Sequence, residues 1–354
     1  MSVTRSRFEP EEALLAAGRS SLAAEVADAL RHRCGLKAGA RILIGFSGGP
    51  DSTALLLLLL ALSRRSEAAC SRPTALHLDH GLRDESAREA DHAMAICGML
   101  GVDCEVIRLE LDPDSSDLAS RARDARYRAL EQIAVQQGVD AVAVGHHAED
   151  RLETMLQSLC RGAGPQGLAS PRWQRSLGGT RLVRPLLGSS RAALVALCRK
   201  VGVPVVADPT NERLDTARGL LRGKVIDVLE ERWPGSAIRA SAAADRIAST
   251  AVLLERELDA IFGSPDLLEW PRHVLQGLDV EFISAGLRRS VLAHDSGLED
   301  ALSAGQLLQP ARAASGDDRR PRVHQIGGGW AVAIDAGHVR VVPPDQSSAG
   351  GATS

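Results

Sequence analysis

The chain has 354 residues, of which 44% are hydrophobic, 25% charged and 3% aromatic, and its formal net charge is −3. This length predicts two domains, and the near-neutral charge gives no global sign of nucleic-acid binding. The six cysteines include no C-x-x-C pair, the first twelve residues lack the apolar core of a signal peptide, and the apolar run 55–60 is too short to span a bilayer. We therefore expect a cytoplasmic protein without a membrane segment.

The first part of the chain alternates short apolar runs with helical patterns. Strands are predicted over 41–46, 74–79, 102–109 and 139–144, and helices over 51–63, 85–100 and 117–137, with another ending near residue 160. This alternation predicts an α/β fold, a Rossmann-like parallel sheet with helices on both faces. Ligands of such sheets bind at the carboxyl ends of the strands.

The composition and the predicted secondary structure change twice in the rest of the chain. Residues 162–188 are rich in Gly, Pro and Ser and predict a long loop, and a helix-rich stretch follows from 189 to 231. We place the domain boundary at Pro234-Gly235. The predicted organisation is a first domain over 1–235 with its core at about 38–215, a small C-terminal α+β domain over 236–343 with one long helix and short strands, and a disordered low-complexity tail over 344–354.

One segment between a strand and a helix carries a chemical signal. It is the run Ser47, Gly48, Gly49, Pro50, Asp51 and Ser52. The glycines let the backbone approach a ligand closely, and successive N–H groups at a helix start form an anion cradle. Asp51 can cap the helix or hold Mg²⁺. A plain tight turn is the structural alternative, and the absence of a G-K-[ST] lysine excludes a Walker loop.

This S-G-G-x-D-S string resembles the signature of the PP-loop, or N-type ATP pyrophosphatase, superfamily. Within it, further segments are similar to those of the tRNA(Ile)-lysidine synthase family and follow the family order over about residues 40–235. They are 76–83 (LHLDHGLR), 122–127 (ARDARY), 145–154 (GHHAEDRLET), 161–164 (RGAG) with 167–168 (GL), 184–187 (RPLL), 208–211 (DPTN) and 218–222 (RGLLR). Glu149, Arg151 and Gly219 depart from the family pattern, where Asp, Gln and Asn are usual.

The resemblance implies a ligase that forms a carbon–nitrogen bond. ATP, with Mg²⁺, would adenylate C2 of the wobble cytidine in an isoleucine tRNA with a CAU anticodon, with release of pyrophosphate. The amine of free L-lysine would then displace AMP and leave lysidine. The implied partners are that tRNA and lysine, without a membrane, and a homodimer is left open. The first domain is then the ATP-binding catalytic domain, and the C-terminal domain binds tRNA.

The same resemblance assigns roles to individual residues. The catalytic or substrate-binding set is Asp79, His80, Arg123, His146, His147, Asp150 and Glu153, and the tRNA-binding set is Arg184, Arg218 and Arg222. Residues 161–224 contain twelve basic and three acidic side chains, which suits phosphate contacts, although an exposed Arg-rich surface would show the same balance. Asp150 has a capping alternative at a helix start. Zinc is not expected, because a third soft ligand near His146 and His147 is missing.

Three other functions compete with this interpretation. A PP-loop tRNA 2-thiolase often carries paired cysteines, which this sequence lacks. An amidotransferase-type synthetase usually brings a glutaminase, for which no nucleophilic cysteine motif is present. A tRNA-binding protein without catalysis is disfavoured by the intact loop at 47–52.

Overall fold

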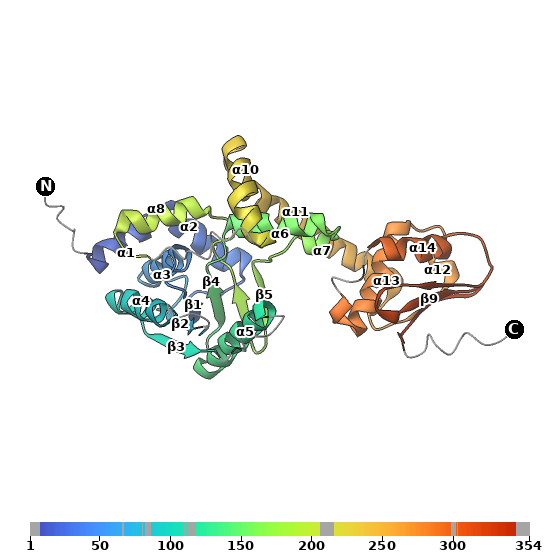
Figure 1. Cartoon of the computed structure of the whole chain (residues 1–354), viewed down its shortest axis with the longest axis horizontal. Helices are drawn as coiled ribbons and strands as arrows, with labels where there is room; N and C mark the ends of the chain where they lie inside the picture. The colour runs from blue at the N-terminus through green and yellow to red at the C-terminus, as the bar shows by residue number, and fades with distance from the viewer. Residues whose placement is uncertain are drawn as a thin grey trace. The chain divides into compact units, whose positions relative to one another are not determined.

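The structure is a computed structural model of the chain and forms two compact units (Figure 1). Unit 1 comprises residues 1–154 and 171–243, and unit 2 comprises residues 155–170 and 244–354. The structure describes residues 8–65, 67–79, 81, 86–109, 111, 118–205, 216–298, 302 and 304–344. His80, the 208–211 segment and part of the predicted tail lie outside these residues. No described helix is long and apolar enough to cross a membrane.

Unit 1 is built on a six-stranded sheet with the order β3-β2-β1-β4-β6-β5. The strands are β1 (Ile42–Gly45), β2 (Thr74–Asp79), β3 (Cys104–Arg108), β4 (Ala141–Val144), β5 (Gln174–Leu177) and β6 (Thr180–Val183). All neighbours pair in parallel except β5 and β6, which are antiparallel. The chain builds outward from β1 through β2 to β3 and then returns to the other side of β1 with β4. The prediction of a mostly parallel, Rossmann-like sheet is confirmed.

Helices cover both faces of this sheet. The covering helices are α1 (Pro10–Gly18), α2 (Ser21–Asp28), α3 (Pro50–Ser63), α4 (Ser86–Met99), α5 (Leu118–Gln137) and α8 (Arg191–Val201). The chain also forms α6 (Ala148–Cys160), α9 (Ala217–Leu220), α10 (Asp227–Arg232) and α11 (Ser236–Phe262). Ile42 and Ile44 of β1 pack with α3, α4 and α8, while Leu43 packs with α5 on the opposite face. This alternation follows from the period of two in a strand.

Helix α3 is the centre of the larger core. Leu55–Leu60 are at most 1% exposed, so this helix is apolar on every side. It packs between the sheet and the outer helices α1, α2 and α8. A helix that is hydrophobic all round must be enclosed in this way. Because α3 is buried, its first turn and the adjoining 47–52 loop are held in place against the core.

The prediction of a long loop over 162–188 is wrong. This region contains the short helix α7 (Pro165–Leu168) and the hairpin of β5 and β6. In β5, Gln174, Arg175 and Ser176 are exposed, so the strand shows no apolar alternation. Its partner β6 is held by parallel pairing to β4, with Leu182 opposite Val142. The pairing of β5 with β6, which itself pairs with β4, therefore makes this segment a strand although its local composition does not predict one.

Unit 2 contains a four-stranded antiparallel sheet with the order β7-β10-β9-β8. Its elements after α11 are β7 (Glu269–Pro271), α12 (Arg272–Leu275), α13 (Val280–His294), α14 (Ala304–Ser315), β8 (Arg322–Gln325), β9 (Ala331–Ile334) and β10 (His338–Val342). Phe262 and Trp270 meet edge to face in its core, with ring centroids 5.2 Å apart. The expected small α+β character of this region is confirmed.

Gly145 follows β4 and lies directly against the first turn of α3. A Cβ atom at this position would come within 3.0 Å of the Ser52 nitrogen and 3.1 Å of the Asp51 carbonyl carbon. Both neighbours are backbone atoms, so they cannot swing aside. A side chain at residue 145 would push the end of β4 away from α3.

We predict that Gly145→Ala lowers the free energy of unfolding by about 1–3 kcal/mol, the usual cost of overpacking. The matched control is Gly98→Ala in α4, where a Cβ atom would meet nothing within 4 Å. Alanine there should be neutral or slightly stabilising, because it favours helix more than glycine does. Urea unfolding of both variants measures the difference. Equal midpoints would contradict the close approach at Gly145.

Candidate active site

Three neighbouring parallel strands end side by side and place the predicted site residues together. The 47–52 loop follows β1, the segment beginning with Gly145 follows β4, and Arg184 follows β6 directly. The gap between β1 and β4 is where the chain reverses the direction in which it adds strands. Open α/β sheets bind ligands at this kind of switch point.

The 47–52 loop is braced by its two serines. The hydroxyls of Ser47 and Ser52 lie 3.0 Å apart, and the Ser52 hydroxyl donates to the carbonyl of Gly49 at 3.1 Å. The Ser52 Oγ also accepts from the N–H of Ser47 at 3.3 Å. Gly48 has φ +76°, a left-handed conformation that favours glycine. The loop is therefore a preformed turn that leads into α3.

Asp51 is the carboxylate of this loop with unused binding capacity. Its Oδ1 atom is buried and has no hydrogen-bond partner among the described residues. Burial raises the pKa of Asp51, against the opposing effect of His147 and Arg191. No group of three or more His, Cys, Asp or Glu in the described part of the chain could hold a metal ion. Mg²⁺ needs only one or two carboxylates together with substrate phosphates, which Asp51 fits.

His147 links the loop to the acidic residues of α6. Its Nδ1 lies 3.0 Å from Glu149 Oε2, and its Nε2 lies 3.4 Å from Asp150 Oδ2 and 3.7 Å from Asp51 Oδ2. Burial would lower the pKa of this imidazole, but the carboxylates of Asp150, Glu149 and Asp51 together raise it. His147 is therefore protonated more easily than a free imidazole, and it joins three carboxylates across two strand ends.

His146 has the opposite electrostatic character. Arg184 donates from Nε to His146 Nδ1 at 3.0 Å and from Nη1 to the carbonyl of Arg172 at 2.7 Å. Burial lowers the pKa of His146 to about 3, and Arg184 acts in the same direction. The imidazole is then neutral, and because Nδ1 accepts a hydrogen bond, the hydrogen lies on Nε2. The buried Arg184, predicted to bind tRNA, thus orients a predicted catalytic residue.

Asp150 and Glu153 form a buried carboxylate pair with two arginines. Arg222 Nη2 lies 2.9 Å from Asp150 Oδ1 and 3.2 Å from Glu153 Oε2, while Arg218 Nε contacts Glu153 Oε1. Burial would raise the pKa of Asp150, but His147, the His147 N–H and Arg222 are among the groups that bring it below its ordinary value. For Glu153, burial outweighs Arg218 and Arg222 and raises the pKa. Asp150 is therefore the more easily ionised carboxyl of the pair.

A second arginine cluster surrounds Tyr127 on α5. The guanidinium carbons of Arg123, Arg126 and Arg175 lie 5.7, 5.8 and 4.3 Å from the centre of the Tyr127 ring. Burial would raise the pKa of Tyr127, but Arg184 and these arginines lower it. The predicted site residue Arg123 therefore belongs to a cationic group beside His146 and Arg184. Arg175 is absent from the predicted site, because the composition of 162–188 predicts a loop where the structure has β5.

Other predicted residues lie elsewhere or in supporting contacts. Asp79, at the end of β2, accepts a hydrogen bond from the N–H of Gly81 at 2.8 Å and closes a turn. His77 is buried, and its Nδ1 lies 3.0 Å from the carbonyl of Phe46. Within the described part of the chain, neither forms a hydrogen bond or ion pair with His147. Their neighbour His80 lies outside the described residues, so its predicted role stays a prediction.

The three departures from the family pattern have distinct local environments. Glu149 accepts hydrogen bonds from His147 and from the N–H of Arg191, the first residue of α8, at 2.9 Å. Arg151 is 1% exposed and donates from Nη1 to the hydroxyl of Ser241 at 3.1 Å. Gly219 donates its N–H to the Thr216 hydroxyl that caps α9. The Gly219 contact is a local helix cap, whereas Glu149 and Arg191 lie 42 positions apart and Arg151 and Ser241 lie 90 positions apart, so these two contacts could not be read from a local pattern.

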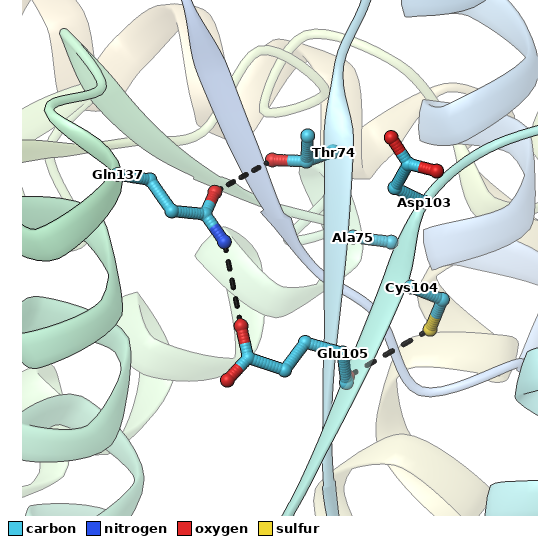
Figure 2. A pocket seen from close by; sticks show the side chains of 6 residues that line it. All are labelled: Thr74, Ala75, Asp103, Cys104, Glu105 and Gln137. Carbon is cyan, nitrogen blue, oxygen red and sulfur yellow. Dashed lines mark hydrogen bonds between the residues drawn. The ribbon is translucent and has the colours of Figure 1, made fainter.

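A shallow pocket lies away from this cluster, at the amino ends of β2 and β3 (Figure 2). It is lined by Thr74, Ala75, Asp103, Cys104, Glu105 and Gln137. Thr74 donates to Gln137 at 3.1 Å, and the Gln137 amide donates to Glu105 at 3.4 Å. Thr74, Gln137 and Glu105 are thus joined by hydrogen bonds, and none of the lining residues belongs to the predicted site.

Comparison with known proteins agrees with this geometry. A profile of the PP-loop domain matches residues 20–229. The tRNA(Ile)-lysidine synthase of Pseudomonas putida is 37% identical over 272 residues, which cover 76% of this chain and 61% of that protein. The corresponding enzyme of Alkalilimnicola ehrlichii is 36% identical over 321 residues, which cover 84% of this chain and 69% of that protein. The chain thus spans about two thirds of the length of these two relatives.

One solved structure shares the fold at lower similarity. The U34-tRNA thiolase NcsA from Methanococcus maripaludis, with its 4Fe-4S cluster, has a TM-score of 0.54 and 18% sequence identity. The alignment covers 64% of this chain and 78% of that one. At this identity the likeness establishes a common PP-loop fold and does not identify a common substrate.

The buried ion pairs yield a stability prediction. Arg222→Met removes a cation that faces both Asp150 and Glu153, and we expect a loss on the order of 3 kcal/mol in the free energy of unfolding, because unpaired buried carboxylates are costly. Arg199→Met on the exposed side of α8 is the control and should change it by less than about 0.5 kcal/mol. Urea midpoints give both values. A loss in Arg222→Met no larger than in the control would show that the pairs are not maintained in solution.

Proposed function

The chain belongs to the tRNA(Ile)-lysidine synthase family of PP-loop proteins, and from this premise we propose that it is a ligase that converts the wobble cytidine of the CAU-anticodon isoleucine tRNA to lysidine. The observation that carries the proposal is the convergence of two segments from adjacent strands, the 47–52 loop and the His146–Asp150 segment. The 47–52 loop can bind the phosphates of ATP, and the acidic side chains of the second segment can bind the ammonium group of an amine.

The 47–52 loop supports the adenylation step of the proposal. Backbone N–H groups and the start of α3 provide an anion cradle for the pyrophosphate part of ATP. Asp51, with its unsatisfied buried Oδ1, would hold Mg²⁺, which neutralises phosphate charge when bound. Transferring AMP to the C2 oxygen of cytosine then gives a good leaving group. The neutral His146 and the arginines around Tyr127 lie beside β4 and β6, where they can hydrogen-bond to the activated base.

The carboxylates Asp150 and Glu153 of α6 support the binding of lysine. Asp150 has a lowered pKa, so it is a better anchor for the lysine ammonium group than a general base. The raised pKa of Glu153 makes this carboxyl the stronger proton acceptor of the pair. We therefore assign positioning to Asp150 and give Glu153 the role of accepting the amine proton before attack on C2.

A sulfur nucleophile is disfavoured by the state of the nearby cysteine. Cys198 on α8 donates from Sγ to the carbonyl of Pro50 at 3.4 Å. Burial raises the pKa of Cys198 to about 12, with Asp51 acting in the same direction. The thiolate, which is the reactive form, is then scarce near neutral pH. An amine nucleophile suits this site better than the thiolase alternative.

Binding of tRNA belongs to the same proposal. The basic residues of 161–224 would contact phosphates, and unit 2 would hold a further part of the tRNA. A cytoplasmic location suits a substrate of this kind. Formation of a homodimer stays a prediction, which the molar mass of the chain in solution tests.

The central test is incubation with ATP, radiolabelled lysine and the CAU-anticodon isoleucine tRNA. We expect label in this tRNA, release of AMP and pyrophosphate, and no label in other tRNAs used as controls. Lysine incorporated into no tRNA would overturn the proposal. Release of pyrophosphate without lysine incorporation would retain the adenylation half and reject the lysine half.

We predict that Asp150→Asn lowers lysine incorporation by about a hundred-fold, because the amide retains the shape of the side chain and loses the charge that positions the ammonium group. Release of pyrophosphate from ATP should fall much less, since Asp150 acts in the second step. Asp227→Asn at the exposed start of α10 is the control. Asp150→Asn with the same lysine KM and turnover as the control would refute the assignment.

The affinity for tRNA should fall steeply with salt. If the basic segment makes six or more phosphate contacts, the association constant falls about a thousand-fold between 50 and 200 mM salt. Filter binding across this range measures the slope. A flat dependence would mean that the basic residues of 161–224 do not contact phosphates.

A further inference from the structure

An exposed tryptophan follows α10 in unit 1. Trp233 is 55% exposed, whereas Trp270 and Trp330 are each 3% exposed. Tryptophan is highly buried on average, because its large ring contributes strongly to core packing. An exposed Trp233 therefore contributes less to the stability of the fold than a buried tryptophan would. Figure 1 shows the α10 segment projecting away from the six-stranded sheet.

The backbone around this tryptophan is held firmly. The N–H of Trp233 donates to the Leu229 carbonyl at 2.8 Å, and its own carbonyl accepts from Arg239 Nη2 at 3.1 Å. The Glu230 carboxylate accepts hydrogen bonds from the turn 235–237 at 2.7–2.8 Å. Trp233 thus lies on a rigid corner between α10 and α11, so a ligand would not have to order the backbone beneath it.

The surroundings of the ring favour an anionic, aromatic ligand. The Arg232 guanidinium carbon lies 5.6 Å from the centre of the Trp233 ring. Residues 216–243 contain five basic and three acidic side chains. Arg218 and Arg222 pair with the carboxylates of α6 and Glu230 is engaged in the turn, so the remaining charged side chains are Lys224, Arg232, Arg239, Asp227 and Glu231. An aromatic face with arginine beside it is a common site for an unpaired base of single-stranded RNA, where the base stacks and the cation attracts the backbone.

This corner is connected to the proposed active site by continuous helix. Arg218 and Arg222, which pair with the buried carboxylates of α6, lie in α9 and η3 (Leu221–Ile226), and α10 follows without a break. Fifteen residues of helix from Arg218 to Trp233 cover about 22 Å. One RNA molecule can reach both places, with the reacting base in the proposed active site and another nucleotide at Trp233.

We propose that Trp233 is a stacking platform for an unpaired base of the RNA substrate, outside the site of reaction. The proposal rests on the proposed function in that the substrate is a tRNA. Stacking on Trp233 positions the tRNA and is tolerant of base identity, since every base has a π face. Recognition of the reacting cytidine is left to the strand ends.

The experiment uses the full chain and the CAU-anticodon isoleucine tRNA. Stacking should quench the fluorescence of Trp233, and Trp233→Phe should abolish that quench while it retains most of the affinity. Trp233→Leu should weaken tRNA binding by about ten- to a hundred-fold. Val228→Ala is the matched control, because Val228 is 58% exposed on α10 and has no ring. A fully paired RNA duplex of equal length should cause no quench, since its bases are already stacked.

Two results would overturn the proposal. One is wild-type tRNA affinity in Trp233→Leu, with folding verified by circular dichroism. The other is a Trp233 quench that depends on protein concentration without RNA, which would mean that a second copy covers the ring. Lysine incorporation by the wild-type chain separates the two claims. Quenching without incorporation supports the platform and rejects the proposed reaction, whereas incorporation with wild-type affinity in Trp233→Leu rejects only the platform.

Discussion

The close approach of Gly145 to the first turn of α3 is the contact on which the site depends. It brings the end of β4 against the backbone of Asp51 and Ser52, with no side chain between them. Because β1 and β4 pair in parallel over their full lengths, the 47–52 loop and the His146–His147 segment leave the sheet at the same level. The buried α3 keeps this alignment rigid, so both halves of the site are held by core packing.

Charge balance is the second constraint at these strand ends. Asp150 and Glu153 stay buried because Arg218, Arg222 and His147 face them. Removing water from charged groups is costly unless partners replace it, so each part of the cluster depends on the others. Among the described residues, the Oδ1 atom of Asp51 has no hydrogen-bond partner, and burial raises the pKa of this carboxyl. A cation arriving with ATP would relieve that cost.

Sequence patterns identified the elements whose signals are local. The strands β1, β2, β3 and β4 and their helices followed from apolar periodicity, to within about two residues. The hairpin of β5 and β6 did not, because Gln174 and Arg175 are polar and their pairing depends on the distant β4. The Pro-Gly pair predicts one domain boundary at residue 235, whereas the two compact units divide within α6, after residue 170 and within α11. The boundaries of the compact units are decided by contacts between segments that are distant in the sequence.

The sequence by itself determined the 47–52 loop, the order of the motifs and the family, because each is a pattern of neighbouring residues. Only the tertiary structure decided which of those motifs touch. Arg184 contacts His146 across 38 positions, Arg222 contacts Asp150 across 72, and Arg151 contacts Ser241 across 90. It also decided that Arg184 is buried and orients a histidine. Such pairings depend on strand order and on the direction of each side chain, which local patterns do not encode.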